Sequence, residues 1–387
     1  MKLYRLVIIF HLIYLSVESQ NESKLIIDAS LNQTNSNPLI RLRNSQGDDL
    51  LWVHSDNATN TFMGFSSGVA NTGVSNTFIG SFAGILNMSA DYNTAVGYAA
   101  LSRNRSGELN TAVGSFACRN CQSGSYNTAL GYFSLYYTNG AEYNTAIGYN
   151  AGSTWNNGYN NVFVGANTDV TTTGLFNVIA MGQGTGVSAS STARFGNSAT
   201  MSYGGWANWT DVSDGRYKKN IRANVPGLEF ILRLEPVTYN LDVSAISRDL
   251  NENQGKEWNI EMKNAIAEKE KMLQTGFIAQ EVERIAREIG FDFSGVDAPK
   301  NEKDMYGLRY AEFVVPLVKA VQKLNTALLW QNEKLSDEIE QLAIQNEAMK
   351  QRLSSLEFDL GVGEELTQIG MEKSKRILVP KLKQSHN

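Results

Sequence analysis

A serine and a lysine five residues apart, Ser213 and Lys218, are the residues whose types and spacing could perform covalent chemistry. A lysine acts as a general base when burial lowers its pKa, because removal from water disfavours the ammonium form. Such a base could take the serine hydroxyl proton and make the serine a nucleophile. On spacing alone, the simpler interpretation is a solvated turn in which Asp214 and Arg216 pair at the surface.

Other covalent and metal chemistries lack the residues that they need. The 387-residue chain holds three histidines, His11, His54 and His386, and two cysteines. A Ser-His-Asp or Cys-His nucleophile needs a histidine in the body of a domain, and zinc sites need more ligands than these. We therefore expect no metal site and no cofactor. The net charge of −5 gives no sign of nucleic-acid binding.

The N-terminus has the features of a secretory signal peptide over residues 1–19. Lys2 and Arg5 precede an apolar run over residues 6–15, and small residues follow it. The run is too short for a comfortable membrane span, which favours a cleaved signal over an uncleaved anchor. No second apolar stretch of spanning length follows. We expect a protein that is secreted or lies at the cell surface, with no membrane span once the signal is removed.

Cys118 and Cys121 form the only cysteine pair, in a sequence rich in Gly, Ser and Asn. A redox-active C-x-x-C motif stands at a helix start in a thioredoxin-like unit, which these flanks do not resemble. The pair therefore predicts a local disulfide, or two thiols, in a turn.

A short internal repeat dominates the first half of the chain. An Asn-Thr-apolar-apolar-Gly unit recurs every 16 or 17 residues, beginning at Asn60, Asn76, Asn93, Asn110, Asn127, Asn144 and Asn161, with a degenerate copy at Asn177. Such a strict period indicates one supersecondary unit copied and stacked. Helical repeats need about 30 residues or more, so we predict a parallel β-solenoid, or β-roll, of about 17-residue coils over residues 60–212, after a short β lead-in over residues 20–59.

The fixed positions of the repeat have physical roles in a solenoid. The asparagine can form a hydrogen-bonded ladder from coil to coil, and the glycine suits a tight turn or a close backbone approach. Over residues 60–200 the units, of which residues 93–100 are typical, resemble the head repeats of trimeric autotransporter adhesins and of bacterial and phage tail-fibre proteins. That resemblance implies a homotrimer.

The composition changes sharply close to residue 212. No lysine lies between Lys24 and Lys218, and no proline lies between Pro38 and Pro226, whereas lysine, glutamate and leucine dominate afterwards. A domain boundary is therefore expected at this point.

The sequence after the boundary resembles the endosialidase-type intramolecular chaperone, peptidase family S74. Four ordered motifs carry the resemblance, in residues 213–221, 234–240, 275–282 and 310–324. Between the second and the third, residues 243–272 are polar and charged and look like a variable insertion. The resemblance implies an α+β chaperone domain over residues 213–317.

The resemblance also assigns roles to the residues at the boundary. Ser213 would be the nucleophile, Lys218 the general base, and the bond between Val212 and Ser213 the scissile bond. The chaperone would help three chains to fold and then release itself by this single cut. The remaining residues that match the family's motifs are Asp214, Arg216, Asn220, Gln280 and Glu281.

The C-terminal part shows a heptad repeat over residues 318–356. Every d position is apolar, and three of the six a positions are asparagine, as expected for a coiled coil in which register is specified. The heptads alone do not separate a dimer from a trimer, but both resemblances imply three chains. Residues 357–387 are predicted to be a polar tail.

Two other functions remain open from the sequence. The C-terminal domain could be a permanent trimerisation foot that never cuts. Alternatively, the repeats could form an adhesin head that binds a cell-surface glycan or matrix, with exposed aromatic residues that stack on sugars. The candidates for such stacking are Tyr98, Tyr132, Tyr136, Tyr137 and Tyr149.

Overall fold

The computed structural model describes residues 24–27, 40–154 and 157–359. The predicted signal peptide and nearly all of the predicted tail lie outside this part of the chain. Contacts divide the chain into two compact units. The first comprises residues up to 217 together with 235–280 and 296–308, and the second comprises 218–234, 281–295 and the residues from 309 onward.

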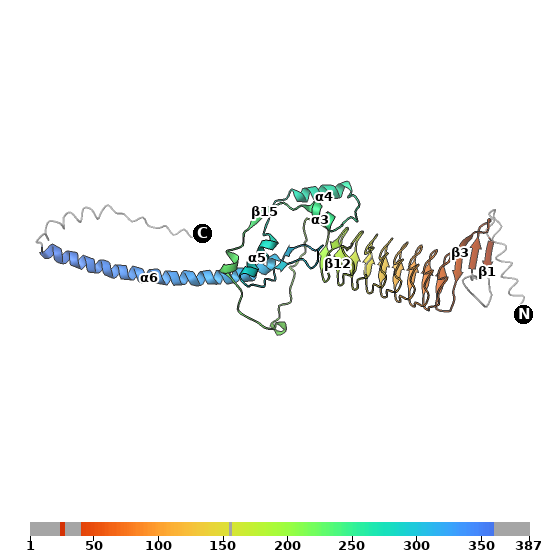
Figure 1. Ribbon diagram of the computed structural model, residues 1–387, viewed down its shortest axis with the longest axis horizontal. Helices are drawn as coiled ribbons and strands as arrows, with labels where there is room; N and C mark the ends of the chain where they lie inside the picture. The colour runs from red at the N-terminus through yellow and green to blue at the C-terminus, as the bar shows by residue number, and fades with distance from the viewer. Residues whose placement is uncertain (1–23, 28–39, 155–156, 360–387) are drawn as a thin grey trace. The chain divides into compact units, whose positions relative to one another are not determined.

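A parallel β-solenoid forms most of the first unit, as the repeat predicts (Figure 1). Three-residue strands from successive coils pair side by side in register. They are β4 (Thr61–Met63), β5 (Thr77–Ile79), β6 (Thr94–Val96), β7 (Thr111–Val113), β8 (Thr128–Leu130), β9 (Thr145–Ile147), β10 (Val162–Val164), β12 (Ile179–Met181) and β14 (Ala193–Phe195). The short strands β11 (Asp169–Val170) and β13 (Gly186–Val187) pair in a second sheet.

An antiparallel lead-in precedes the coils. The strands β1 (Lys24–Ile27), β2 (Ile40–Arg43) and β3 (Asp49–His54) follow one another in the sheet, and β3 pairs antiparallel with β4.

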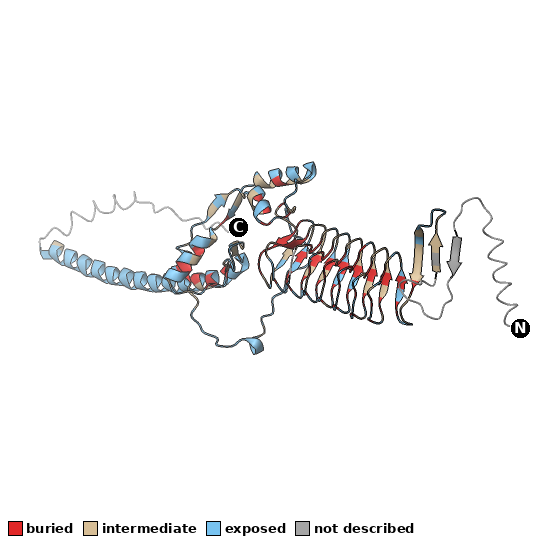
Figure 2. Ribbon diagram, turned by 45° about the vertical axis from the view of Figure 1, so that its right-hand side comes forward, coloured by how far each residue is buried: buried red, intermediate tan, exposed pale blue. Residues whose placement is uncertain are grey.

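In the strands β4 to β10 and in β12, the middle residue is buried, while its two neighbours are half-buried or exposed (Figure 2). Phe62, Phe78, Phe163 and the alanines between them are fully buried, and the rings of Phe62 and Phe78 stack with centroids 5.1 Å apart. One buried residue per strand gives a narrow core. No coil could bury this face alone, so stacking supplies the stability.

The repeat asparagines form the predicted ladder inside the solenoid. Asn110 is fully buried. Its side-chain amide donates to the carbonyl oxygen of Gly124 at 2.9 Å, and its Oδ1 accepts from the backbone N–H of Asn127 at 3.0 Å. Each asparagine thereby pairs backbone groups that the three-residue strands leave open, which a buried turn requires.

The repeat glycines form a second column, in which backbones touch. Gly97 has a φ of +133°, and a Cβ placed on it would lie 2.6 Å from the carbonyl carbon of Gly114 in the next coil. Both the conformation and the space therefore demand glycine.

The last repeats depart from the register expected from the sequence. Val162 pairs with Ile179, so Val178 and not Asn177 stands at the position of the repeat asparagine. Its backbone N–H still donates to Asn161 Oδ1 at 3.0 Å, but its side chain cannot continue the ladder. The placement of the degenerate repeat at Asn177 was therefore wrong by one residue, because a valine replaces the asparagine and the adjacent asparagine imitates it. The next coil is shorter than the others, since Ile179 pairs with Ala193, 14 residues further on.

Two helices and two small two-stranded sheets complete the first unit. The helix α3 (Val243–Asp249) begins at Asp242, whose side chain accepts from the N–H of Ala245, and Asn259 caps α4 (Ile260–Glu270) in the same way. The strands β15 (Val237–Tyr239) and β16 (Gln274–Gly276) pair antiparallel, as do β17 (Val296–Asp297) and β18 (Gly307–Leu308). A 3₁₀ turn, η1, spans Gly215–Tyr217.

The second unit is built around a long helix, α6 (Val314–Asp359), of 46 residues. The short helix α2 (Leu228–Ile231), most of α5 (Ala279–Glu288) and the 3₁₀ turn η2 (Tyr310–Phe313) belong to this unit. Its core is an aromatic cluster made of Phe230, Phe291, Phe293 and Phe313.

Beyond this cluster, α6 is exposed along its length (Figure 2). Its apolar heptad residues are solvent-exposed, from 46% at Leu335 to 66% at Ile339. Of the helices in the described part of the chain, none combines the length and the apolar composition that crossing a bilayer requires. The apolar seam predicted from the heptads is therefore present, but in the single chain it faces water.

Candidate functional site

The junction that carries Ser213 and Lys218 is an exposed segment. Every residue from 201 to 213 is exposed, and Val212 has 89% of its surface accessible. Ser213 and Lys218 are exposed as well. The bond between Val212 and Ser213 is therefore accessible to solvent.

A hydrogen-bonded turn follows Ser213 directly. The carboxylate of Asp214 accepts from the backbone N–H of Arg216 at 2.9 Å and pairs with its guanidinium at 2.6 Å. The carbonyl oxygen of Asp214 accepts from the N–H of Tyr217 at 3.1 Å, which closes η1. The Arg216 hydrogen bonds hold the pKa of Asp214 below its ordinary value, and Asp214 raises the pKa of Arg216. The motif thus fixes the backbone directly after the candidate nucleophile.

The other motif residues are exposed. Asn220 adopts a left-handed conformation with a φ of +56°, which asparagine tolerates better than most residues. Gln280 and Glu281 lie in the first turn of α5, where Glu281 pairs with Arg284 at 2.8 Å. Of the predicted residues at this junction, Asp214 and Arg216 are joined by a hydrogen bond and an ion pair.

The two cysteines form a disulfide inside the solenoid. Cys118 and Cys121 are linked and fully buried, and Cys121 Sγ lies 2.7 Å from the hydroxyl of Thr138. A buried disulfide of this kind offers no accessible thiol for exchange chemistry. In the part of the chain that the structure describes, no cluster of three or more His, Cys, Asp or Glu side chains could hold a metal ion.

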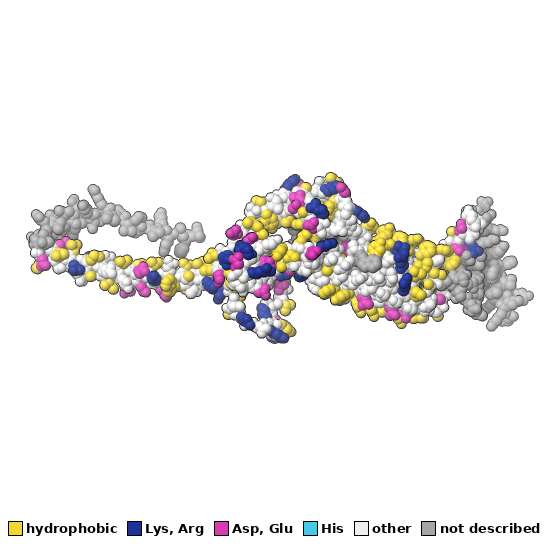
Figure 3. Space-filling view, viewed as in Figure 1, with side chains coloured by type: hydrophobic (Ala, Val, Ile, Leu, Met, Phe, Trp, Pro, Cys, Tyr) yellow, Lys and Arg dark blue, Asp and Glu magenta, His cyan; other side chains and the backbone are white. Residues whose placement is uncertain are grey.

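The tyrosines proposed for sugar stacking divide into two groups. Tyr98, Tyr132, Tyr137 and Tyr149 are exposed by 43–49%, and hydrophobic side chains gather over the solenoid surface (Figure 3). Tyr136 was expected to be exposed, which is wrong, since only 7% of its surface is accessible. Its ring stacks on Phe133 with centroids 4.4 Å apart and its hydroxyl accepts from Arg119, so it serves packing.

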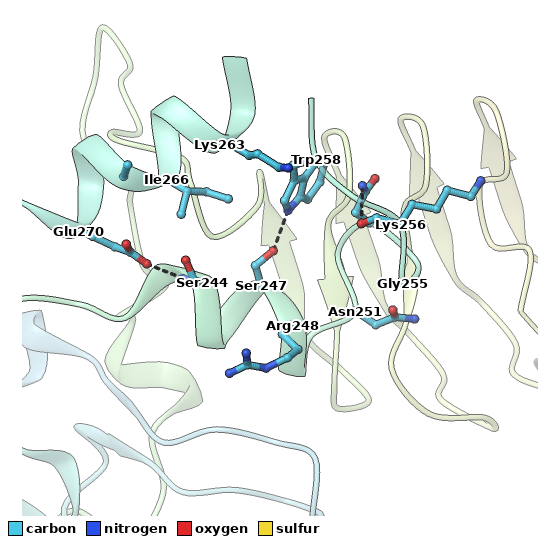
Figure 4. A pocket seen from close by; sticks show the side chains of 12 residues that line it. Ser244, Ser247, Arg248, Asn251, Gly255, Lys256, Trp258, Lys263, Ile266 and Glu270 are labelled. Carbon is cyan, nitrogen blue, oxygen red and sulfur yellow. Dashed lines mark hydrogen bonds between the residues drawn. The ribbon is translucent and has the colours of Figure 1, made fainter. Parts of the chain in front are cut away.

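One region of polar contacts was missed in the sequence. Residues 243–272, which the sequence predicts to be a variable insertion, form α3, α4 and a pocket of about 480 Å³ (Figure 4). Trp258 Nε1 donates to Ser247 Oγ at 3.1 Å in this pocket, and Glu270 accepts from the N–H of Ser244 at 2.8 Å. These contacts follow no periodic pattern in the sequence. The polar composition of the insertion was the one signal that set it apart from the rest of the domain.

These features define a class of protein. A parallel β-solenoid followed by a mixed α/β region and a long C-terminal helix has the architecture of a fibre-like protein with a separate C-terminal part.

Comparison with known families narrows this class. The model of the peptidase S74 family, described as chaperone of endosialidase, matches residues 213–291. The match begins at Ser213 and includes Lys218, Gln280 and Glu281, which confirms the arrangement inferred from the motifs. Searches of curated proteins and of solved structures found no match.

Proposed function

We propose that this chain is a secreted or surface-located trimeric fibre protein, whose C-terminal domain assists trimer folding and cuts the chain once, between Val212 and Ser213. The observation that carries the proposal is the chaperone-of-endosialidase match, which starts at Ser213 and contains Lys218. The solenoid that precedes the match supplies the part to be folded.

The cut needs the side chains of two residues and one water molecule. Lys218 Nζ takes the hydroxyl proton of Ser213, and Ser213 Oγ attacks the carbonyl carbon of Val212. The bond from that carbon to the amide nitrogen of Ser213 breaks as the nitrogen receives the proton, which leaves an ester between Val212 and Ser213 Oγ. Water then hydrolyses the ester to a Val212 carboxylate and a Ser213 hydroxyl with a free amine.

Exposure of the junction makes the reaction depend on assembly. Lysine becomes a base only when it is withdrawn from water, whereas Lys218 is exposed in the single chain. The apolar seam of α6 is exposed too, and burial of such seams drives helices to associate. Three chains joined through α6 would bring three junctions together and desolvate them, so cutting follows trimerisation.

A second candidate is a structural fibre that keeps its C-terminal part as a permanent foot. The solvated Asp214–Arg216 turn favours it, because such a turn also occurs at surfaces with no chemistry. A third candidate is glycan or matrix binding by the exposed Tyr98, Tyr132 and Tyr149. A glycan array probed with residues 20–212 in trimeric form tests that activity, and absence of binding counts against it.

Intact-mass spectrometry of the secreted protein tests the proposed cut. Wild type should yield a C-terminal fragment that begins at Ser213, and Ser213→Ala and Lys218→Ala should each abolish it. Lys219→Ala is the matched control, because this neighbouring lysine is equally exposed and has no assigned role. Uncut wild-type trimers would overturn the self-cleavage proposal and leave the permanent foot.

A further inference from the structure

Residues 241–270, here called the cap segment, are hydrogen-bonded to the end of the solenoid. The carboxylate of Glu252, only 2% exposed, accepts from both the N–H and the hydroxyl of Ser198 at 2.6 Å. The ammonium of Lys269 donates to the carbonyl oxygens of Ser198 at 2.7 Å and Thr200 at 2.6 Å. One short turn of the solenoid is therefore held from both sides by charged groups, which form the stronger kind of hydrogen bond.

The same segment also reaches back over earlier coils. Gln254 accepts from the side-chain amide of Asn150, and the ammonium of Lys256 lies 5.7 Å from the centroid of the Tyr149 ring. Figure 4 shows Gly255 and Lys256 beside the strands of the solenoid, with Trp258 to their left in this view.

A second segment, residues 296–308, adds further contacts with the solenoid. Asp304 accepts from the hydroxyl of Ser188 at 2.7 Å, and the Asn301 side-chain amide donates to the carbonyl oxygen of Ser188 at 2.7 Å. Lys303 donates to the carbonyl oxygen of Thr171 at 3.3 Å. Two separate stretches that follow the junction in sequence thus bind the coils that precede it.

Apolar packing accompanies these polar contacts. Ala199, at the end of the solenoid, is 7% exposed and belongs to one cluster with Val243 and Ile266 of the cap segment. Trp258 and Met262 pack against that cluster. The interface therefore combines a small apolar cluster with hydrogen bonds from the Glu252 and Lys269 side chains, as stable interfaces combine an apolar core with polar contacts.

The sequence of the repeat differs in the coil that the cap segment contacts. In the eight coils whose repeat glycines run from Gly64 to Gly182, the position two residues after that glycine is left-handed, with φ between +52° and +67°. Seven coils place a side chain there, namely Ser66, Phe82, Ala99, Phe116, Phe133, Asn150 and Asn167. The eighth has Gly184, although the conformation evidently does not require glycine.

The reason for glycine at this position is the cap segment. A Cβ on Gly184 would lie 2.4 Å from the carbonyl oxygen of Glu252 and 2.8 Å from the Trp258 ring. Likewise, a Cβ on Gly186 would lie 2.4 Å from the carbonyl oxygen of Leu250. The coils thus leave space for the backbone of the cap segment.

We propose that the cap segment and residues 296–308 form a binding surface for the last coils of the solenoid, so that the two parts of the chain stay together after the backbone is broken between residues 201 and 213. As regards the natural cut, this inference rests on the proposed function. It replaces the release that the family resemblance implies with retention of the C-terminal part as a non-covalent partner. None of the contacts above involves the exposed linker, so none needs the chain to be continuous.

The test uses the full chain with a site for an external protease inserted between residues 204 and 212, in a Ser213→Ala background. Retention is then measured without any self-cleavage, so failure of the proposed function leaves the result interpretable. After cutting, size-exclusion chromatography and denaturing gels should show both parts in one peak at micromolar concentration. Separation of the unmodified parts into two peaks overturns the proposal.

Two pairs of variants locate the interface. Gly184→Ala should weaken association at least about ten-fold, as loss of contacts of this type does, whereas Gly174→Ala should not. Gly174 is the matched control because its φ is +77° and nothing lies within 4 Å of its Cβ.

The second pair keeps the solenoid unchanged. Glu252→Gln should weaken association to a similar degree, while Glu257→Gln should leave it intact, because the Glu257 side chain is 87% exposed and pairs with Lys263. Circular dichroism of each variant before cutting checks its fold. Unchanged association in both Gly184→Ala and Glu252→Gln overturns the assignment of the interface.

Discussion

The solenoid and the long helix α6 differ in how far a single chain buries their repeated residues. Inside the coils, the ladder asparagines such as Asn110 are buried and hydrogen-bonded from one coil to the next. Along α6, apolar residues such as Leu342 and Met349 stand 57% and 60% exposed. Both regions are periodic, yet the repeated residues of the coils are buried within the chain, whereas those of α6 remain exposed.

The candidate site resembles α6 in that its residues are exposed in the single chain. Ser213 and Lys218 are exposed, as is the seam of α6. A chain can therefore fold its coils before its chemistry is possible. This order would suit a reaction that must not precede assembly.

The largest effect is expected from breaking the seam of α6. Leu342→Asp should convert trimers to monomers, because three carboxylates would replace an apolar d layer. Analytical ultracentrifugation measures the mass. Gln341→Asp, at the neighbouring c position, is the control and should stay trimeric. A Leu342→Asp trimer would show that α6 does not hold the chains together.

Removing one asparagine of the ladder should have a smaller effect than Leu342→Asp, and it should act on the stability of a single chain. Asn110→Ala removes the partners of the Gly124 carbonyl and the Asn127 N–H, both buried. Each lost partner costs roughly 1–3 kcal/mol, so the free energy of unfolding of the solenoid should fall by about 4 kcal/mol. Urea unfolding followed by circular dichroism measures it. Thr111→Ala, on the exposed neighbour, should change stability by under about 0.5 kcal/mol.

A buried acid makes solenoid stability depend on pH. Burial raises the pKa of Asp169 to about 6, although hydrogen bonds from Thr154, Val170 and Ser153 oppose the shift. The folded state therefore holds this proton more tightly than the unfolded state, whose value is 3.8. The contribution of Asp169 to stability is therefore fully present below about pH 4 and is lost as the pH rises through about 6, by up to about 3 kcal/mol.

Asp169→Asn should remove this part of the pH dependence. Urea midpoints at pH 4, 5, 6 and 7 measure it, with Glu142→Gln as the control on an exposed acid of the same coils. A slope that is the same in Asp169→Asn and in wild type would contradict the assignment.

The smallest effect is expected from the disulfide. Replacing Cys118 and Cys121 with alanine opens a loop of four residues, which should lower the free energy of unfolding by about 2 kcal/mol. Wild type unfolded with a reductant present should lose a similar amount. If only the alanine variant loses stability, packing of the sulfur atoms matters and the link does not.

The periodic regions of the fold were the ones that the sequence predicted best. The coils, the ladder and the heptads were predictable because the same residue types recur at the same positions of each repeat. The register failed at Asn177, where Val178 replaces the repeat asparagine. Tyr136 was misjudged because Phe133, a neighbour within its own coil, covers it.

The site was predicted to a different extent. Motif order located Ser213 and Lys218, and the family match covers both. The contact of Glu252 with Ser198 joins residues 54 positions apart and repeats nowhere, so no pattern could reveal it. Charged residues in an insertion are more often solvated, and only the packing shows which of them is buried.

The glycine column bears on how such a chain can lengthen. Strands of adjacent coils lie about 4.8 Å apart, so a 17-residue coil adds that much length, whereas the same residues in an α-helix would add about 25 Å. Because Gly97 meets Gly114 in the way that Gly114 meets Gly131, one whole coil can be duplicated or lost in the gene without disturbing its neighbours. Variation in coil number would then be tolerated in whole-coil steps, whereas an insertion of a few residues would misalign every glycine beyond it.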